Sequence, residues 1–151
     1  MRGDDAAAAQ YEPETGVRRK MTAQHLVRVV QTIVVAGAVL FGAATLLAGG
    51  RVLLGFDPGY VVFRPLLIYN TAMGLAYVAA GITVWRNVNA GRNAAGAIFL
   101  LNLLVLVGIL VIYGAGGAVA VDSLRAMTLR TIVWLVLFFG ASWLVRRRAR
   151  A

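Results

Sequence analysis

A short loop-forming stretch carries the side chains of this sequence that are most able to do chemistry. Asp57 lies between Arg51 and Arg64, so one carboxylate and two guanidinium groups could act on a lipid or a quinone at a membrane surface, and Asp57 could pair with either arginine. One carboxylate without a base or a metal is little equipment for catalysis. Asp57-Pro58-Gly59 also has the composition of a tight turn. The turn is the favoured interpretation of this outer-loop cluster (Arg51, Asp57, Arg64).

Five uncharged polar residues inside long apolar stretches form the second candidate group. They are Gln31, Asn70, Tyr77, Asn102 and Ser142. A buried amide seeks partners on neighbouring helices, so we expect Asn102 to bond to the helix that carries Tyr77, with Tyr77 or a free carbonyl as its partner. Gln31 and Ser142 share one depth in the predicted bundle. Such residues either join helices or line a pocket for a quinone, a lipid or a small solute, and joining helices is the commoner role.

Other chemistries lack the residues they need. The chain has no cysteine and one histidine, His25, which excludes Cys-ligated metals, thiol chemistry and a haem held by paired histidines. No clustered carboxylates or imidazoles could hold a catalytic metal, and no Ser-His-acid set occurs at one membrane depth. Asp57 and Asp122 fall in predicted loops. The sequence therefore predicts no catalytic or metal centre and no cofactor.

The elements that must position these residues follow from composition. Of 151 residues, 60% are hydrophobic and 14% charged, whereas about a quarter of the residues in a soluble domain are charged. No Asp, Glu, Lys or Arg occurs in residues 29–50, 65–85, 93–121 and 131–145. A spanning helix needs about 20 apolar residues, so the fourth stretch must borrow residues 127–130, with Arg130 snorkelling to the interface. The sequence predicts an all-α integral membrane protein, an antiparallel up-down bundle of four transmembrane helices.

The same pattern predicts the boundaries. Residues 1–24 hold four of the six acidic residues and lack apolar periodicity, which predicts a flexible cytoplasmic tail. Residues 25–148 form the predicted transmembrane domain, and residues 149–151 a basic C-terminal end. The helices are predicted at about 25–48, 65–85, 94–113 and 123–148. Gly49–Gly50 is expected to stop the first helix, and Asp122 to cap the last.

Basic residues indicate the orientation. Eleven of the fifteen lie on the N-terminal flank, in the middle loop or in the C-terminal tail, and the other two loops share four. This bias places both termini in the cytoplasm of a bacterial-type inner membrane, beside anionic lipid headgroups. The aromatic residues agree, with Trp85 and Trp143 near the inner ends and Tyr69 and Tyr113 near the outer ends. The C-terminal basic run lacks interleaved aromatics, so no nucleic acid is expected as a partner.

Small residues predict where the helices approach one another closely. They recur in the first two predicted helices, as Gly37, Ala38 and Gly42 and as Ala72, Gly74, Ala76, Ala80 and Gly81. Because small side chains let helix backbones come close, these two helices are expected to be the tightest pair. The last helix is bulky and is expected to face lipid or another protein.

Three functions compete on this evidence. The lack of charge in the apolar centres, combined with small-residue packing, favours a non-catalytic membrane protein, either an accessory subunit or a self-associating scaffold within a homo-oligomer or larger complex. The alternative is a passive channel or carrier for a small or apolar solute, lined by Asn70, Tyr77 and Asn102 with Gln31. One chain of four helices has little room for a pore, so that role would require oligomerisation. An enzyme acting through the outer-loop cluster is the weakest of the three.

Overall fold

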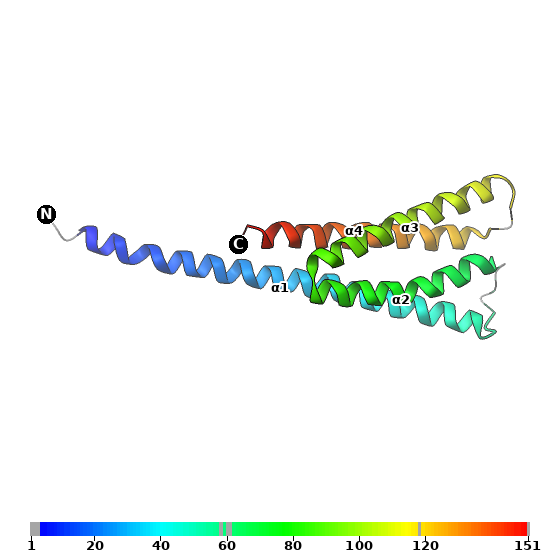
Figure 1. Ribbon diagram of the computed structural model, residues 1–151, viewed down its shortest axis with the longest axis horizontal. Helices are drawn as coiled ribbons and strands as arrows, with labels where there is room; N and C mark the ends of the chain where they lie inside the picture. The colour runs from blue at the N-terminus through cyan, green and yellow to red at the C-terminus, as the bar shows by residue number, and fades with distance from the viewer. Residues whose placement is uncertain (1–3, 58, 60–61, 118, 151) are drawn as a thin grey trace.

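The computed structural model is all-helical over its described residues, 4–57, 59, 62–117 and 119–150. Its four helices are α1 (Asp4–Leu53), α2 (Arg64–Arg86), α3 (Val88–Gly114) and α4 (Val121–Arg148). Each helix is long and apolar enough to span a membrane, and in α1 the candidate span is Gln24–Leu53. Figure 1 shows the α1–α2 and α3–α4 connections at one end of the molecule, which we call the loop end. The α2–α3 connection lies at the opposite end of α2 and α3, part-way along the molecule because α1 extends beyond it, and we call this the Asn87 end.

The N-terminal part of α1 differs from the sequence prediction. A flexible tail is predicted over residues 1–24, but the backbone is helical from Asp4 onward, and residues 1–3 lie outside the described part of the chain. Alanine and long charged side chains, which are strong helix formers, are common in this segment, although it also contains Pro13 and Gly16. A helix already formed over residues 24–53 also extends without a new nucleation cost. In Figure 1 this part of α1 projects beyond the other three helices.

The predicted stop of α1 at Gly49–Gly50 is also wrong, because the helix continues to Leu53. Gly49 instead lies against the side chain of Thr71 on α2, where a Cβ would have no room. The chain leaves the helix at Gly55, which adopts a φ of +102° that favours glycine.

A single residue, Asn87, makes the turn between α2 and α3. The sequence predicts a loop up to about residue 93, but α3 begins at Val88. The extended Asn87 backbone donates its N–H to the carbonyl of Thr83 at 2.7 Å, and its side chain accepts the N–H of Ala90 at 3.1 Å. Asn87 thus ends α2 and caps α3, so a connection of one residue is enough.

The start of α4 corrects another prediction. The N-cap residue is Ala120, which provides no side-chain hydrogen bond, and Asp122 lies in the first turn of the helix. The Asp122 carboxylate pairs with Arg125 at 3.4 Å instead of capping the helix. An acidic residue in the first turn still interacts favourably with the positive end of the helix dipole.

The tightest helix pair is α1 with α2, as predicted from the small residues, and its contact is the most extensive in the molecule. A Cβ built on Gly42 would lie 2.9 Å from the carbonyl oxygen of Gly74 and 2.9 Å from the backbone nitrogen of Val78. A Cβ on Gly81 would lie 2.8 Å from a methyl group of Val39. The two backbones meet where neither helix has a side chain to separate them. Ala72, by contrast, is exposed and takes no part in this contact.

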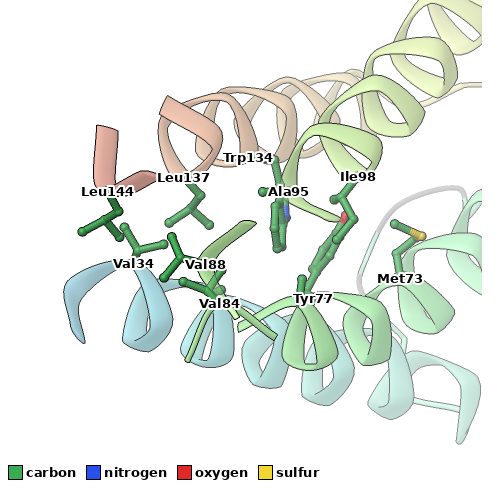
Figure 2. Packing of buried hydrophobic residues seen from close by; sticks show 12 residues of the cluster. Val34, Met73, Tyr77, Val84, Val88, Ala95, Ile98, Trp134, Leu137 and Leu144 are labelled. Atoms are coloured by element: carbon green, nitrogen blue, oxygen red, sulfur yellow. The ribbon is translucent and has the colours of Figure 1, made fainter. Parts of the chain in front are cut away.

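Two apolar clusters form the core. The larger one draws residues from all four helices, and in its centre Trp134 of α4 and Tyr77 of α2 project toward each other (Figure 2). The smaller one lies toward the loop end and is built on Leu66, Ile109, Val119 and Met127. The side chains of Trp134, Tyr77, Met127 and Leu144 are 0–1% exposed, so the interior is filled where the helices meet.

The prediction that α4 faces lipid or another protein is therefore wrong for one of its faces. Trp134, Met127 and Leu144 lie in the core. The opposite face of α4 carries large apolar side chains that are 53–62% exposed at three positions spaced by three or four residues, Ile132, Val136 and Phe139.

Substitution of Gly42 tests the close approach of α1 and α2. Gly42→Ala is expected to lower the free energy of unfolding by about 1–3 kcal/mol, because the new methyl group meets the backbone of α2. Unfolding in detergent, followed by circular dichroism as the fraction of SDS rises, measures the change. Gly50→Ala, also on α1, is the matched control, since its Cβ would meet nothing within 4 Å, and it should keep or slightly raise stability. Equal stability of the two variants would contradict the contact.

Candidate functional site

Asn102 is the centre of a buried polar cluster, which we call the Asn102 cluster. Its side chain is 0% exposed, and its Oδ1 accepts the hydroxyl of Tyr77 at 2.9 Å and the hydroxyl of Tyr69 at 3.1 Å. The predicted bond to Tyr77 is confirmed. Tyr69 was predicted only as a ring at the outer end, although it stands eight residues before Tyr77, a spacing that returns to the same face of a helix. One amide oxygen on α3 thus holds two side chains of α2.

Aromatic rings enclose this cluster. The Tyr77 ring lies 4.8 Å from that of Trp134, tilted by 41°, and 5.8 Å from that of Phe41. Asn102 Nδ2 and Trp134 Nε1 are buried donors without an acceptor in the described part of the chain. Each such group costs about 1–3 kcal/mol relative to a satisfied one. The cluster is therefore rich in donors and is held in place by packing as well as by its hydrogen bonds.

Gln31 forms a second polar contact, at the Asn87 end, which we call the Gln31 clasp. Its Nε2 donates to the carbonyls of Val84 and Trp85 at 3.1 and 3.3 Å, and its Oε1 accepts Nη2 of Arg148 at 2.7 Å. Both carbonyls belong to the last turn of α2, where no partner exists within the helix. One amide therefore joins α1, α2 and α4.

Ser142, predicted at the same depth as Gln31, is not part of the clasp. Its side chain is half-buried and forms no hydrogen bond within the described residues. The partner of Gln31 is instead Arg148, which the sequence placed among the basic residues of the C-terminal flank. Arg148 lies six residues beyond Ser142 and reaches Gln31 because its side chain is much longer than that of serine.

A cleft of about 110 Å³ lies near the loop end, between α1, α2 and α4, and we call it the Arg130 cleft. Its polar lining consists of Thr45, Asn70, Asp122, Ser123 and Arg130. The sequence placed Arg130 at the lipid interface, but its side chain is half-buried among the helices. Asn70 of the cleft directly follows Tyr69 of the Asn102 cluster in α2, so the two places are neighbours along that helix.

Asn70 lies in this cleft and not in the Asn102 cluster. Its Oδ1 is buried without a hydrogen-bond partner in the described part of the chain. The predicted polar residues thus separate into three places: Tyr77 and Asn102 in the centre, Gln31 at the Asn87 end and Asn70 near the loop end. They do not form one continuous lining.

The outer-loop cluster is not assembled. The Arg51 guanidinium lies 4.6 Å above the Phe56 ring, and Asp57 Oδ1 accepts the N–H of Gly59 at 2.9 Å. Gly59 has a φ of +78°, as the predicted turn requires, while Pro58 lies outside the described residues. In the described ranges, no ion pair joins Asp57 to Arg51 or Arg64. The contacts of this stretch are those of a turn.

The Asn102 cluster, the Gln31 clasp and the Arg130 cleft can form hydrogen bonds, and the cleft can also bind charged groups. Across the described residues, no three His, Cys, Asp or Glu side chains converge in the way that a metal ion needs. The Asn102 cluster and the Gln31 clasp have the geometry of contacts between helices. The Arg130 cleft combines a carboxylate, a guanidinium, an amide and two hydroxyls around a space, and it is the place best suited to a ligand.

The Asn102 cluster gives a test of its hydrogen bonds. Asn102→Leu is expected to lower the free energy of unfolding in detergent by about 1–3 kcal/mol, because two buried hydroxyls lose their acceptor. The triple variant Tyr69→Phe/Tyr77→Phe/Asn102→Leu should regain most of this loss, since removing both partners is nearly neutral.

Ser142→Ala is the control, because it removes a half-buried hydroxyl that has no partner, and it should leave stability unchanged. A triple variant no more stable than Asn102→Leu would show that packing, and not hydrogen bonding, holds the cluster.

Comparison with known proteins assigns no relatives. The chain matches no protein-family model, no curated protein and no solved structure. The geometry of these side chains is therefore the basis for assigning a function.

Proposed function

We propose that the chain is a non-catalytic integral protein of a bacterial-type inner membrane, serving as an accessory subunit or a self-associating scaffold. In this proposal it inserts as an antiparallel up-down bundle of four transmembrane helices with both termini in the cytoplasm. The loop end then faces outward, and the Asn87 end faces inward.

The surface of the bundle supports insertion. All four helices meet the length and hydropathy of a membrane span, and many of their large apolar side chains are exposed. A soluble protein rarely leaves so much apolar surface in water. The basic residues at the Asn87 end and at both terminal flanks support the orientation, because such residues accumulate on the cytoplasmic side.

The filled centre of the bundle carries the proposal of a structural role. Tyr77 and Asn102 are both 0% exposed and are bonded to each other, and Trp134, 1% exposed, packs against Tyr77. A passage for a solute would need the space that these side chains occupy. Within one chain they join α2, α3 and α4, which favours a scaffold over a channel.

Outward apolar faces supply the surfaces for association. On α3, Leu104 and Val111 are 68% and 66% exposed and stand seven residues apart, so they share a face with Gly108 between them. On α4, Ile132, Val136 and Phe139 form a comparable face. In a membrane such faces contact either lipid or another helix, and close packing decides between them.

Single cysteines test the proposed topology, because the chain has none of its own. Asp57→Cys near the loop end and Asn89→Cys near the Asn87 end both replace exposed residues. In intact spheroplasts, a membrane-impermeant maleimide should label Asp57→Cys at once and Asn89→Cys only after permeabilisation. Labelling of both in intact spheroplasts would contradict the spanning arrangement, and the reverse pattern would contradict the orientation.

Native mass spectrometry of the tagged protein, extracted gently from its own membrane, tests the scaffold role. A specific hetero-complex or homo-oligomer is expected, and liposomes that contain the protein should be no leakier than empty ones. A monomer with a bound small molecule, or a solute flux that Asn102→Leu changes, would overturn the scaffold in favour of a channel or carrier. The Ser142→Ala variant controls for the effects of substitution itself.

A further inference from the structure

We propose that the Arg130 cleft binds the headgroup of a phospholipid that carries a primary ammonium group, as phosphatidylethanolamine does. The phosphate would lie against Arg130 and Asn70, and the ammonium group toward Asp122. The inference rests on the membrane insertion proposed above but not on the scaffold role.

The shape of the cleft admits a ligand from the side of the bundle. Toward the Asn87 end, α1 and α4 are in contact. A Cβ built on Gly37 would lie 3.5 Å from a methyl group of Leu137, and Gln31 bonds Arg148. Toward the loop end the cleft lies between the same two helices, with Leu67 and Asn70 of α2 also lining it. Its volume of about 110 Å³ is several times the roughly 10–15 Å³ that one water molecule needs.

The depth of Arg130 suits a lipid phosphate. The 28 residues of α4 give a length of about 42 Å at 1.5 Å per residue, against a hydrocarbon core of about 30 Å. The first turn of α4 therefore reaches the headgroup level, and the Cα of Arg130 lies below it. Helical side chains lean toward the N-terminus of their helix, which here is the outer end, and the long arginine side chain can bring its guanidinium to a phosphate from below.

The charges in the cleft follow the order of the charges in the headgroup. Asp122 precedes Arg130 by eight residues, so it lies above it at the mouth of the cleft. In a zwitterionic headgroup the ammonium is likewise attached beyond the phosphate, on the side away from the glycerol and the acyl chains. The Asp122 carboxylate already pairs with Arg125 at 3.4 Å, but that pair is exposed, and a carboxylate can accept further donors.

Two features make the ammonium type of headgroup the better fit. A primary ammonium donates hydrogen bonds to a carboxylate, whereas the quaternary ammonium of choline has no N–H to donate. A headgroup with no positive charge would leave Asp122 facing a phosphate of like charge. Arg130 supplies a planar fork of donors that suits phosphate oxygens, and the unpartnered Asn70 amide, turned about its soft χ2 torsion, can supply one more.

Lipid titration followed by native mass spectrometry tests the assignment. Delipidated protein in detergent is titrated with phosphatidylethanolamine, phosphatidylcholine and phosphatidylglycerol of identical acyl chains. The first should bind at least about fivefold more tightly than the other two, the ratio that corresponds to one hydrogen bond of about 1 kcal/mol. Arg130→Gln should reduce this affinity by about tenfold, and Asp122→Asn should remove the preference over phosphatidylcholine.

Arg64→Gln is the matched control. It removes a positive charge near the loop end from a residue that does not line the cleft, so the variant should bind the lipids like the unmodified chain. Competition by free phosphoethanolamine would show that the headgroup alone suffices, and its failure to compete would show that the acyl chains contribute. Equal binding of the three lipids, tighter binding of phosphatidylglycerol, or no effect of Arg130→Gln would each overturn the assignment. Because the titration uses detergent micelles, its outcome is separate from the topology and the oligomeric state.

Discussion

A polar group enclosed by apolar helices must find its partner inside the protein, and the architecture of this chain depends on that constraint. Asn102 meets it by accepting two tyrosine hydroxyls, which fixes α3 against α2. Gln31 meets it by donating to two carbonyls in the last turn of α2, which have no partner within that helix. Asn87, which is exposed, bonds to the end of α2 with its backbone N–H and to the start of α3 with its side chain. The side-chain amides of Asn102, Gln31 and Asn87 therefore each connect neighbouring helices by hydrogen bonds.

Close backbone approach supplies the rest of the packing. Among apolar surroundings, burial of apolar surface gives little drive for one helix to prefer another, so van der Waals contact decides. The α1–α2 contact achieves this at Gly42 and Gly74, where the backbones touch without intervening side chains. The bulky residues of α4 act differently, because Trp134 fills the space that the smaller residues of the other helices leave. Small residues and one large ring are thus complementary parts of one interior.

Two arginines of α4 show how position changes the role of a charge. Arg148, near the Asn87 end, has an exposed side chain, and its guanidinium bonds the buried amide of Gln31. Arg130 is half-buried and lines the Arg130 cleft. Charge within an apolar region is costly and is kept chiefly where it does something. The proposed headgroup site therefore belongs to Arg130, whereas Arg148 serves the contact between helices.

The number and approximate place of the helices could be predicted from the sequence, because long stretches without charge permit few other structures. It also predicted the Asn102–Tyr77 bond and the close α1–α2 pair, since a buried amide and a row of small residues each have few uses in a bundle. Helix ends were predicted less well. Gly49 and Gly50 predicted the end of the first helix. Gly49 is instead the residue against which Thr71 of α2 packs, and this contact can be seen only when α2 lies beside α1.

Which polar residues meet depends on the assembled fold. Tyr69, Arg130 and Arg148 were each predicted at an interface, but Tyr69 bonds Asn102, Arg130 lines a cleft between helices and Arg148 bonds Gln31. The direction in which a side chain leaves its helix depends on rotation about the helix axis. That rotation is set by the packing of all four helices together, so residue type and depth alone could not reveal it.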